Sequence, residues 1–155
     1  MKTIFAVATI ALAATSAVAQ DVKTRDDLTV QQVMSIASGL RQLNKYDTVD
    51  KEGKATSAYY KFSSDLRYLI ANDLDIATRV ETIFQSANNS LVLSMSNGGS
   101  KVSDEKVGEY TVASQKLIEA PCRCSLYKIK LSDLKLDENP VTSGVLSLIF
   151  PIIEK

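Results

Sequence analysis

The two cysteines, Cys122 and Cys124, are the residues of this sequence whose type and spacing point most directly to chemistry. One residue separates them, whereas the usual thiol redox motif has two intervening residues. Three interpretations remain open: they bond each other, they bond a second chain, or they stay reduced and pack as small apolar side chains. If they lie two residues apart on a strand, their Cα atoms sit near the upper distance limit for a disulfide, which predicts a strained and reducible bond.

The sequence contains no histidine. This excludes Ser-His-Asp and Cys-His catalysis, together with every metal site that needs an imidazole ligand. A metal site is a fourth, weaker option for the two cysteines, because two thiolates need further ligands and no histidine is available, so no metal and no other cofactor is predicted. Ser-x-x-Lys begins at Ser103, Ser125 and Ser132, but the Ser-Asp-Asn and Lys-Thr-Gly motifs of penicillin-recognising acylases are absent. These residue types favour a protein that is not an enzyme.

Carboxylates are the remaining candidates for acid–base chemistry. Asp65, Asp73 and Asp75 lie close together in the sequence. Aspartate is a natural helix cap, and no spacing here places two of these residues together in a cleft. A carboxylate-dependent enzyme therefore remains an alternative hypothesis.

The first 19 residues have the three parts of a cleavable secretory signal peptide. Lys2 is followed by the apolar run 4–14 and by the small-x-small site Ala17-Val18-Ala19. The apolar run of about 11 residues is shorter than the roughly 20 that a membrane-spanning helix needs. We therefore expect cleavage after residue 19, a single globular domain over 20–155 with no integral membrane segment, and an extracytoplasmic location, in the periplasm or secreted.

The charge balance argues against nucleic acid as a partner. The full chain carries 18 basic and 18 acidic residues, and no cluster of Lys and Arg is present. Nucleic-acid binding needs a basic face, because phosphate contacts dominate the affinity. Hydrophobic residues make up 45% of the chain, which is the share of an ordinary folded domain.

Helical periodicity begins soon after the leader. Thr29 and Gln32 have the spacing of a capping box, and the apolar residues that follow predict a helix over 30–44. Gly39 inside this helix allows a close crossing with another helix. Residues 47–57 are polar, contain a glycine, and are predicted to form an exposed loop.

The longest helical pattern covers residues 64–95. Poor helix formers at 72–75 interrupt it, so we expect two helices in near continuity, the second with its own aspartate cap. Another helix is expected from Ser103 to just before Pro121, because proline disfavours helical geometry at the preceding residue.

Residues 122–131 carry the clearest strand pattern. Their apolar residues alternate, and the parity changes near residue 126, which indicates a bulge or burial on both faces. Runs of helices combined with an isolated strand favour an α+β architecture. The predicted fold is α+β and mostly helical, with four to five helices and one small antiparallel sheet around residues 122–131.

The C-terminal run 145–153 is strongly apolar and is interrupted by Pro151. It is too short to span a bilayer and is predicted to form a core helix followed by a packed tail. An exposed apolar patch often marks an interface, so association of two chains through this tail is a further hypothesis. The candidate interface residues are Val145, Leu146, Ile149, Phe150, Ile152 and Ile153.

Three stretches carry a resemblance to known sequences. They are LTVQQVMSIASGL at 28–40, the segment 60–92 that begins YKFSSDLRYLIA and ends SLV, and the segment 136–153 that begins LDENPV. Together they resemble small uncharacterised proteins encoded by phages and prophages of bacteria. The resemblance covers most of the chain after the leader and implies no activity, ligand or site residue.

Three functional hypotheses follow from these patterns. The leading one is a small exported interaction or structural protein, not an enzyme, that binds a protein partner or associates with itself. The second is a small extracytoplasmic enzyme that uses Cys122 and Cys124, or a pair of carboxylates. The third is an inhibitor of an exported enzyme that presents the loop at 47–57.

Overall fold

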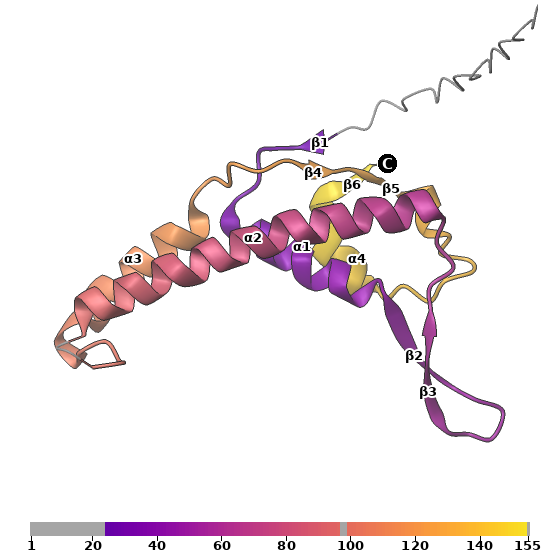
Figure 1. Ribbon diagram of the computed structural model, residues 1–155, viewed down its shortest axis with the longest axis horizontal. Coiled ribbons are helices and arrows are strands. Elements are labelled where there is room, and N and C mark those ends of the chain that lie inside the picture. The colour runs from indigo at the N-terminus through magenta and orange to yellow at the C-terminus, as the bar shows by residue number, and fades with distance from the viewer. Residues whose placement is uncertain (1–23, 97–98, 155) are drawn as a thin grey trace, which may run out of the picture.

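The computed structural model describes residues 24–96 and 99–154, and Figure 1 shows their arrangement. The predicted signal peptide lies outside these residues. The mostly helical α+β fold is confirmed. The α-helices are α1 (Val30–Gln42), α2 (Ser64–Met95), α3 (Val107–Glu119) and α4 (Ser143–Ile149), and the short 3-10 helices are η1 (Asp104–Lys106), η2 (Leu131–Leu134) and η3 (Phe150–Ile152). A search of the described helices finds none long and apolar enough to cross a membrane.

The strands of the described residues form three separate pairs instead of the one sheet expected around 122–131. The antiparallel pairs are β1 (Thr24–Arg25) with β4 (Leu126–Tyr127) and β2 (Lys45–Val49) with β3 (Ala55–Tyr59), and the parallel pair is β5 (Ile129–Lys130) with β6 (Ile153–Glu154). The change of parity near residue 126 reflects a change of pairing partner: β4 pairs near the start of the described chain and β5 pairs at its end. Leu126 and Ile129 are both fully buried.

Helix α1 lies at the centre of the core. It begins at the predicted capping box, in which the Thr29 side chain accepts from the backbone N–H of Gln32 and the Gln32 side chain accepts from the backbone N–H of Thr29. Its buried face packs against α2 and α4. A Cβ atom at Gly39 would lie 2.6 Å from Ile149 Cγ2 and 2.9 Å from Leu148 Cβ, so the predicted close crossing is present and α4 is the partner.

Helix α2 runs without interruption for 32 residues, so the expected break at 72–75 is wrong. Ser63 caps its start, and Asp73 caps nothing. The Asp73 side chain is buried and accepts a hydrogen bond from the backbone N–H of Tyr127 at 2.8 Å. Burial of the neighbouring turns, including Leu66 and Ala77, outweighs the weak helix propensity of this stretch.

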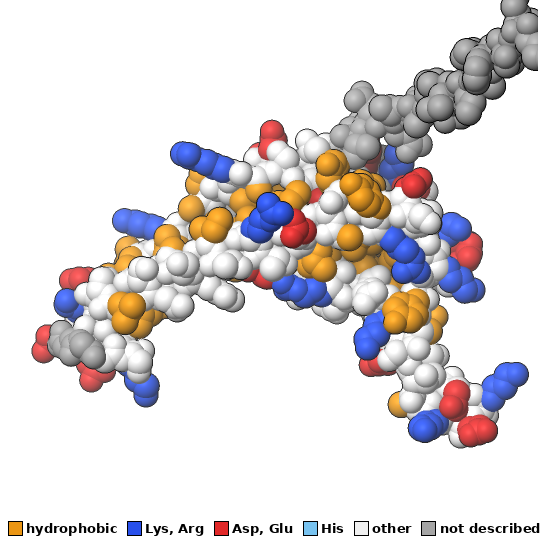
Figure 2. Space-filling model, in the orientation of Figure 1, with side chains coloured by type: hydrophobic (Ala, Val, Ile, Leu, Met, Phe, Trp, Pro, Cys, Tyr) orange, Lys and Arg blue, Asp and Glu red, His pale blue; other side chains and the backbone are white. Residues whose placement is uncertain are grey.

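Two parts of the chain project from the core (Figure 1). The second half of α2, residues 78–95, lies beside α3 and forms with it a two-helix arm, in which no side chain is buried. β2 and β3 form a hairpin where an exposed loop was expected over 47–57; its turn places Gly53 at φ +81°. Figure 2 shows charged side chains gathered at the tip of this hairpin.

Candidate functional site

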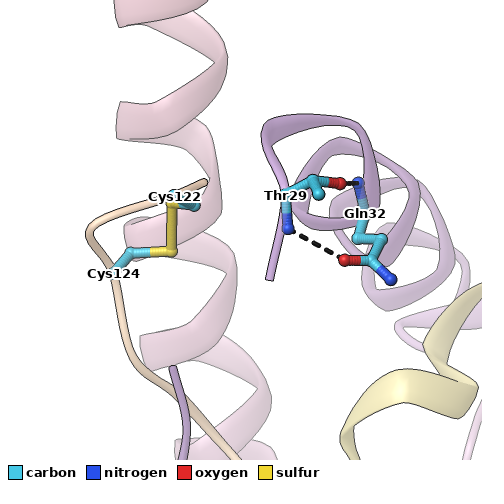
Figure 3. Close-up of a disulfide and its surroundings, with 4 residues drawn as sticks. All are labelled: Thr29, Gln32, Cys122 and Cys124. Atoms are coloured by element: carbon cyan, nitrogen blue, oxygen red, sulfur yellow. Dashed lines mark hydrogen bonds between the residues drawn. A yellow bond between two sulfur atoms is a disulfide. The ribbon is translucent and has the colours of Figure 1, made fainter. Parts of the chain in front are cut away.

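A disulfide joins Cys122 and Cys124 in the structure (Figure 3). Their Cα atoms are 5.4 Å apart, well inside the range of natural disulfides. The expected separation near the upper limit is wrong, because residues 122–125 belong to no strand and the chain turns there. We call residues 121–124 the cysteine turn.

Backbone hydrogen bonds tie the cysteine turn to the start of α1. The N–H of Cys122 donates to the Leu28 carbonyl at 2.7 Å, and the N–H of Val30 donates to the Ala120 carbonyl at 3.0 Å. Thr29, which caps α1, forms an antiparallel bridge with Pro121. The position of the cysteine turn therefore follows from α1, and Figure 3 shows the disulfide across from the Thr29–Gln32 cap.

An apolar groove with a volume of about 290 Å³ opens beside the cysteine turn. It lies where the start of α1, the middle of α2 and the end of α3 meet. The described residues that line it are Val30, Val80, Ile83, Phe84, Ala87, Leu117, Ala120, Pro121, Cys122 and Arg123. Apolar surface with very few polar groups is typical of binding pockets in proteins.

Three residues give the groove its chemical character. Ile83 is 69% exposed, the highest value among the large apolar side chains of the described residues. Arg123 is exposed and is the one charged residue among the described residues that line the groove. Cys122, at 8% exposed, brings one end of the disulfide to the groove wall, while Cys124 is half-buried and is not part of the lining. The groove thus combines apolar contact surface, a positive charge and a disulfide.

Asp73 is the buried carboxylate of the described residues, and it lies outside this groove. Burial raises the pKa of its carboxyl to about 7, against the lowering effect of the hydrogen bond from the Tyr127 N–H. Its second oxygen, Oδ2, has no hydrogen-bond partner among the described residues. Asp65 is exposed, and Asp75 is exposed and pairs with Arg79 at 2.6 Å. The structure therefore brings no two of these three carboxylates together for acid–base work.

The C-terminal run forms part of the core of the same chain. Val145, Ile149 and Ile152 are almost fully buried, and Leu146 and Ile153 are half-buried against the core. Phe150 remains 60% exposed. The expected exposure of this tail is therefore wrong: α4 buries it against α1, where Gly39 lets the two helices approach closely, and association of two chains stays a prediction.

No group of three or more His, Cys, Asp or Glu residues lies together as a metal site in the described part of the chain. Comparison with protein-family models, with curated proteins and with solved structures finds no match.

The groove was not predicted from the sequence. It showed the apolar stripe of α2 and the apolar stripe of α3 separately, each consistent with core packing. One signal was available: Ile83 and Phe84 are adjacent, so one of them must lie at the edge of a helix stripe or beyond it. The structure places Ile83 in the lining of the groove, together with Leu117 and Cys122.

Proposed function

We propose that this protein is an extracytoplasmic interaction protein whose groove beside Cys122 receives an apolar stretch of another polypeptide. The observation that carries the proposal is the exposed Ile83 in a groove that is apolar except for Arg123. Exposed apolar surface framed by polar groups favours binding of another molecule. The signal-peptide pattern of residues 1–19 supports the proposed location.

The groove is large enough to hold a few apolar side chains of a bound polypeptide. An apolar cavity of about 150 Å³ holds one benzene molecule. A volume of about 290 Å³ therefore corresponds to roughly two medium-sized apolar side chains. The neighbouring guanidinium of Arg123 adds charge complementarity for an anionic group next to those side chains.

Binding is tested with ribonuclease A that has been reduced, unfolded and blocked at every thiol, because this chain exposes apolar segments and cannot form disulfides. Fluorescence anisotropy of the labelled chain measures its affinity for the protein. We expect Ile83→Lys to weaken binding at least tenfold, because a charged side chain then enters the apolar groove. Equal affinity of the wild-type protein and this variant would falsify the proposal.

Leu93 supplies the matched control. It lies on the same helix and is 66% exposed, but it does not line the groove. Leu93→Lys therefore adds the same charge to the arm and is expected to leave the affinity within twofold of wild type. Circular dichroism of both variants checks that α2 and α3 remain folded.

Location is tested separately. We expect fractionation of cells that produce the full chain to recover the protein outside the cytoplasm, with Gln20 as its first residue. An intact precursor in the cytoplasm contradicts the location, whereas the binding measurement is independent of it.

A further inference from the structure

The disulfide contributes little to the cohesion of the fold. Cys122 and Cys124 are separated by one residue, so their bond closes a very small ring and links no distant segments of the chain. In the chain-entropy account, the stabilisation by a disulfide decreases as the closed loop becomes shorter. The bond is therefore expected to add little to the stability of the fold.

The cysteine turn is held in place without the disulfide. Hydrogen bonds from Cys122 to Leu28 and from Val30 to Ala120 fix it to α1, and the bridge of Thr29 with Pro121 lies beside them. None of these interactions involves a sulfur atom. The oxidised and reduced forms can therefore share one fold, which is what a disulfide that cycles between two redox states requires.

We propose that the Cys122–Cys124 disulfide exchanges with a pair of cysteines in the polypeptide that binds the groove, and oxidises that pair to a disulfide. The inference rests on the proposed function, because the groove brings the partner thiol to the bond. Cys122 is among the residues that line the groove and Cys124 is not, so we assign the attacked sulfur to Cys122.

The exchange takes two steps, and its electrons balance within one turnover. A partner thiolate attacks Sγ of Cys122, a partner–Cys122 disulfide forms, and the Cys122–Cys124 bond breaks, with its electron pair leaving on Sγ of Cys124. The second partner thiolate then attacks the partner sulfur of this mixed disulfide and releases Cys122 as a thiolate. The partner dithiol has lost two electrons, the protein disulfide has gained two, and the partner's two protons are left on the new Cys122 and Cys124 thiols or in solvent.

The surroundings favour this direction of attack. Cys124 is half-buried and better solvated than Cys122, so it is the better place for the thiolate that leaves. Arg123 lies between the two cysteines in the sequence and lines the groove. A neighbouring guanidinium lowers the pKa of a thiol and attracts an incoming thiolate, so Arg123 is proposed as a residue that assists both steps through charge.

The test uses the full mature protein in its oxidised form and reduced, unfolded ribonuclease A with free thiols, mixed without oxygen. Alkylation followed by mass spectrometry counts the thiols on both chains. We expect the protein to gain two thiols for every disulfide that forms in ribonuclease A. A protein that is isolated with two free thiols, or that gains none from the substrate, overturns the inference.

Three variants test whether the exchange depends on the groove and on the charge of Arg123. Ile83→Lys is expected to slow the transfer at least tenfold, and Leu93→Lys is expected to leave the rate unchanged. Arg123→Gln is expected to slow the transfer several-fold and to raise the pKa of the reduced thiols, followed by thiolate absorbance. Equal rates for wild type and Ile83→Lys overturn the inference, because exchange would then not depend on the groove.

Mapping the transient mixed disulfide after an acid stop identifies the attacked sulfur. We expect the adduct on Cys122; an adduct on Cys124 alone overturns the assigned order of attack. The thiol-blocked chain distinguishes the two proposals: binding of the blocked chain without oxidation of the free-thiol chain contradicts the exchange and leaves the proposed interaction standing. Oxidation that proceeds although the blocked chain does not bind contradicts the proposed interaction.

Discussion

Asp73 Oδ1 accepts a hydrogen bond from the backbone N–H of Tyr127 across 2.8 Å, which joins the middle of α2 to β4. The Asp73 side chain is fully buried, and its Oδ2 has no hydrogen-bond partner among the described residues. Burial penalises the ionised carboxylate more than the single N–H favours it, so the pKa of Asp73 rises from 3.8 to about 7. The carboxyl group at the junction of α2 with β4 therefore changes from neutral to charged as the pH passes about 7.

The first prediction is that the contribution of Asp73 to stability falls as the pH rises from about 4 to about 7. The carboxyl of Asp73 binds its proton more tightly in the folded chain, so its contribution is complete below pH 3.8 and disappears as the pH passes about 7. A shift from 3.8 to about 7 corresponds to roughly 4 kcal/mol of unfolding free energy. Urea unfolding at a series of pH values measures it, as the difference between wild type and Asp73→Asn.

Asp75→Asn provides the control for this prediction. Asp75 lies two residues along the same helix, is exposed, and pairs with Arg79 on the surface. We expect its substitution to change stability by less than about 1 kcal/mol at any pH in this range. An Asp73→Asn variant with the same pH dependence as wild type would show that Asp73 ionises normally in the folded chain.

Asp73 also shows which part of the fold could not be predicted from the sequence. Periodicity and capping chemistry predicted α1 correctly, down to the Thr29–Gln32 capping box, because these signals are local. The break expected at 72–75 rested on local propensity alone. The long-range contact with Tyr127 and burial against the core override that propensity, and no local pattern reports them.

The strand predicted over 122–131 shows a similar limit. Alternation identified the extended segment, but pairing joins it to residues at both ends of the described chain, which the sequence of the segment does not encode. The candidate site was also only partly predictable, because it too depends on contacts between distant segments. Cys122 and Cys124 were recognised by residue type, whereas the groove beside them is built from three helices that meet only in the folded chain.

The second prediction compares two helical glycines. Gly39 is tightly packed against another helix, and Gly108 faces open space. Gly39→Ala places a Cβ 2.6 Å from Ile149 Cγ2, and such overpacking costs about 1–3 kcal/mol, more than the helix propensity gained. Gly108→Ala in α3 meets nothing within 4 Å, and is expected to stabilise by up to about 1 kcal/mol. Denaturant midpoints of the two variants should therefore move in opposite directions. A stabilised Gly39→Ala variant would mean that α1 and α4 are not in close contact.

The third prediction is that reduction of the Cys122–Cys124 bond leaves the fold intact. For a closed loop of three residues the chain-entropy estimate is about 1.6 kcal/mol at most. We expect the far-ultraviolet circular dichroism spectra of the oxidised and reduced proteins to coincide, with only a small fall in the unfolding midpoint. The Cys122→Ser, Cys124→Ser double variant should match the reduced protein. Loss of helical signal on reduction would assign the disulfide a structural role.

The last prediction concerns Asn139, a buried amide that joins the segment before α2 to the end of η2. Its Oδ1 accepts from the backbone N–H of Lys61 at 2.7 Å, and its Nδ2 donates to the Leu134 carbonyl at 2.9 Å. Asn139→Ala leaves both backbone groups without this partner and is expected to cost about 2–4 kcal/mol. Glu138→Ala next to it, on the surface, is expected to change stability by less than about 0.5 kcal/mol.

Asn139→Asp extends this prediction, because it tests the need for a hydrogen-bond donor at the Nδ2 position. The variant keeps the oxygen that faces Lys61 but replaces the Nδ2 donor with an oxygen that faces the Leu134 carbonyl. An ionised carboxylate there is buried and repelled, so the loss of stability relative to wild type should be larger at pH 7 than at pH 4, where the carboxyl is protonated and donates in place of Nδ2. A loss that is equal at both pH values would mean that the carboxyl of this variant is not held against the Leu134 carbonyl.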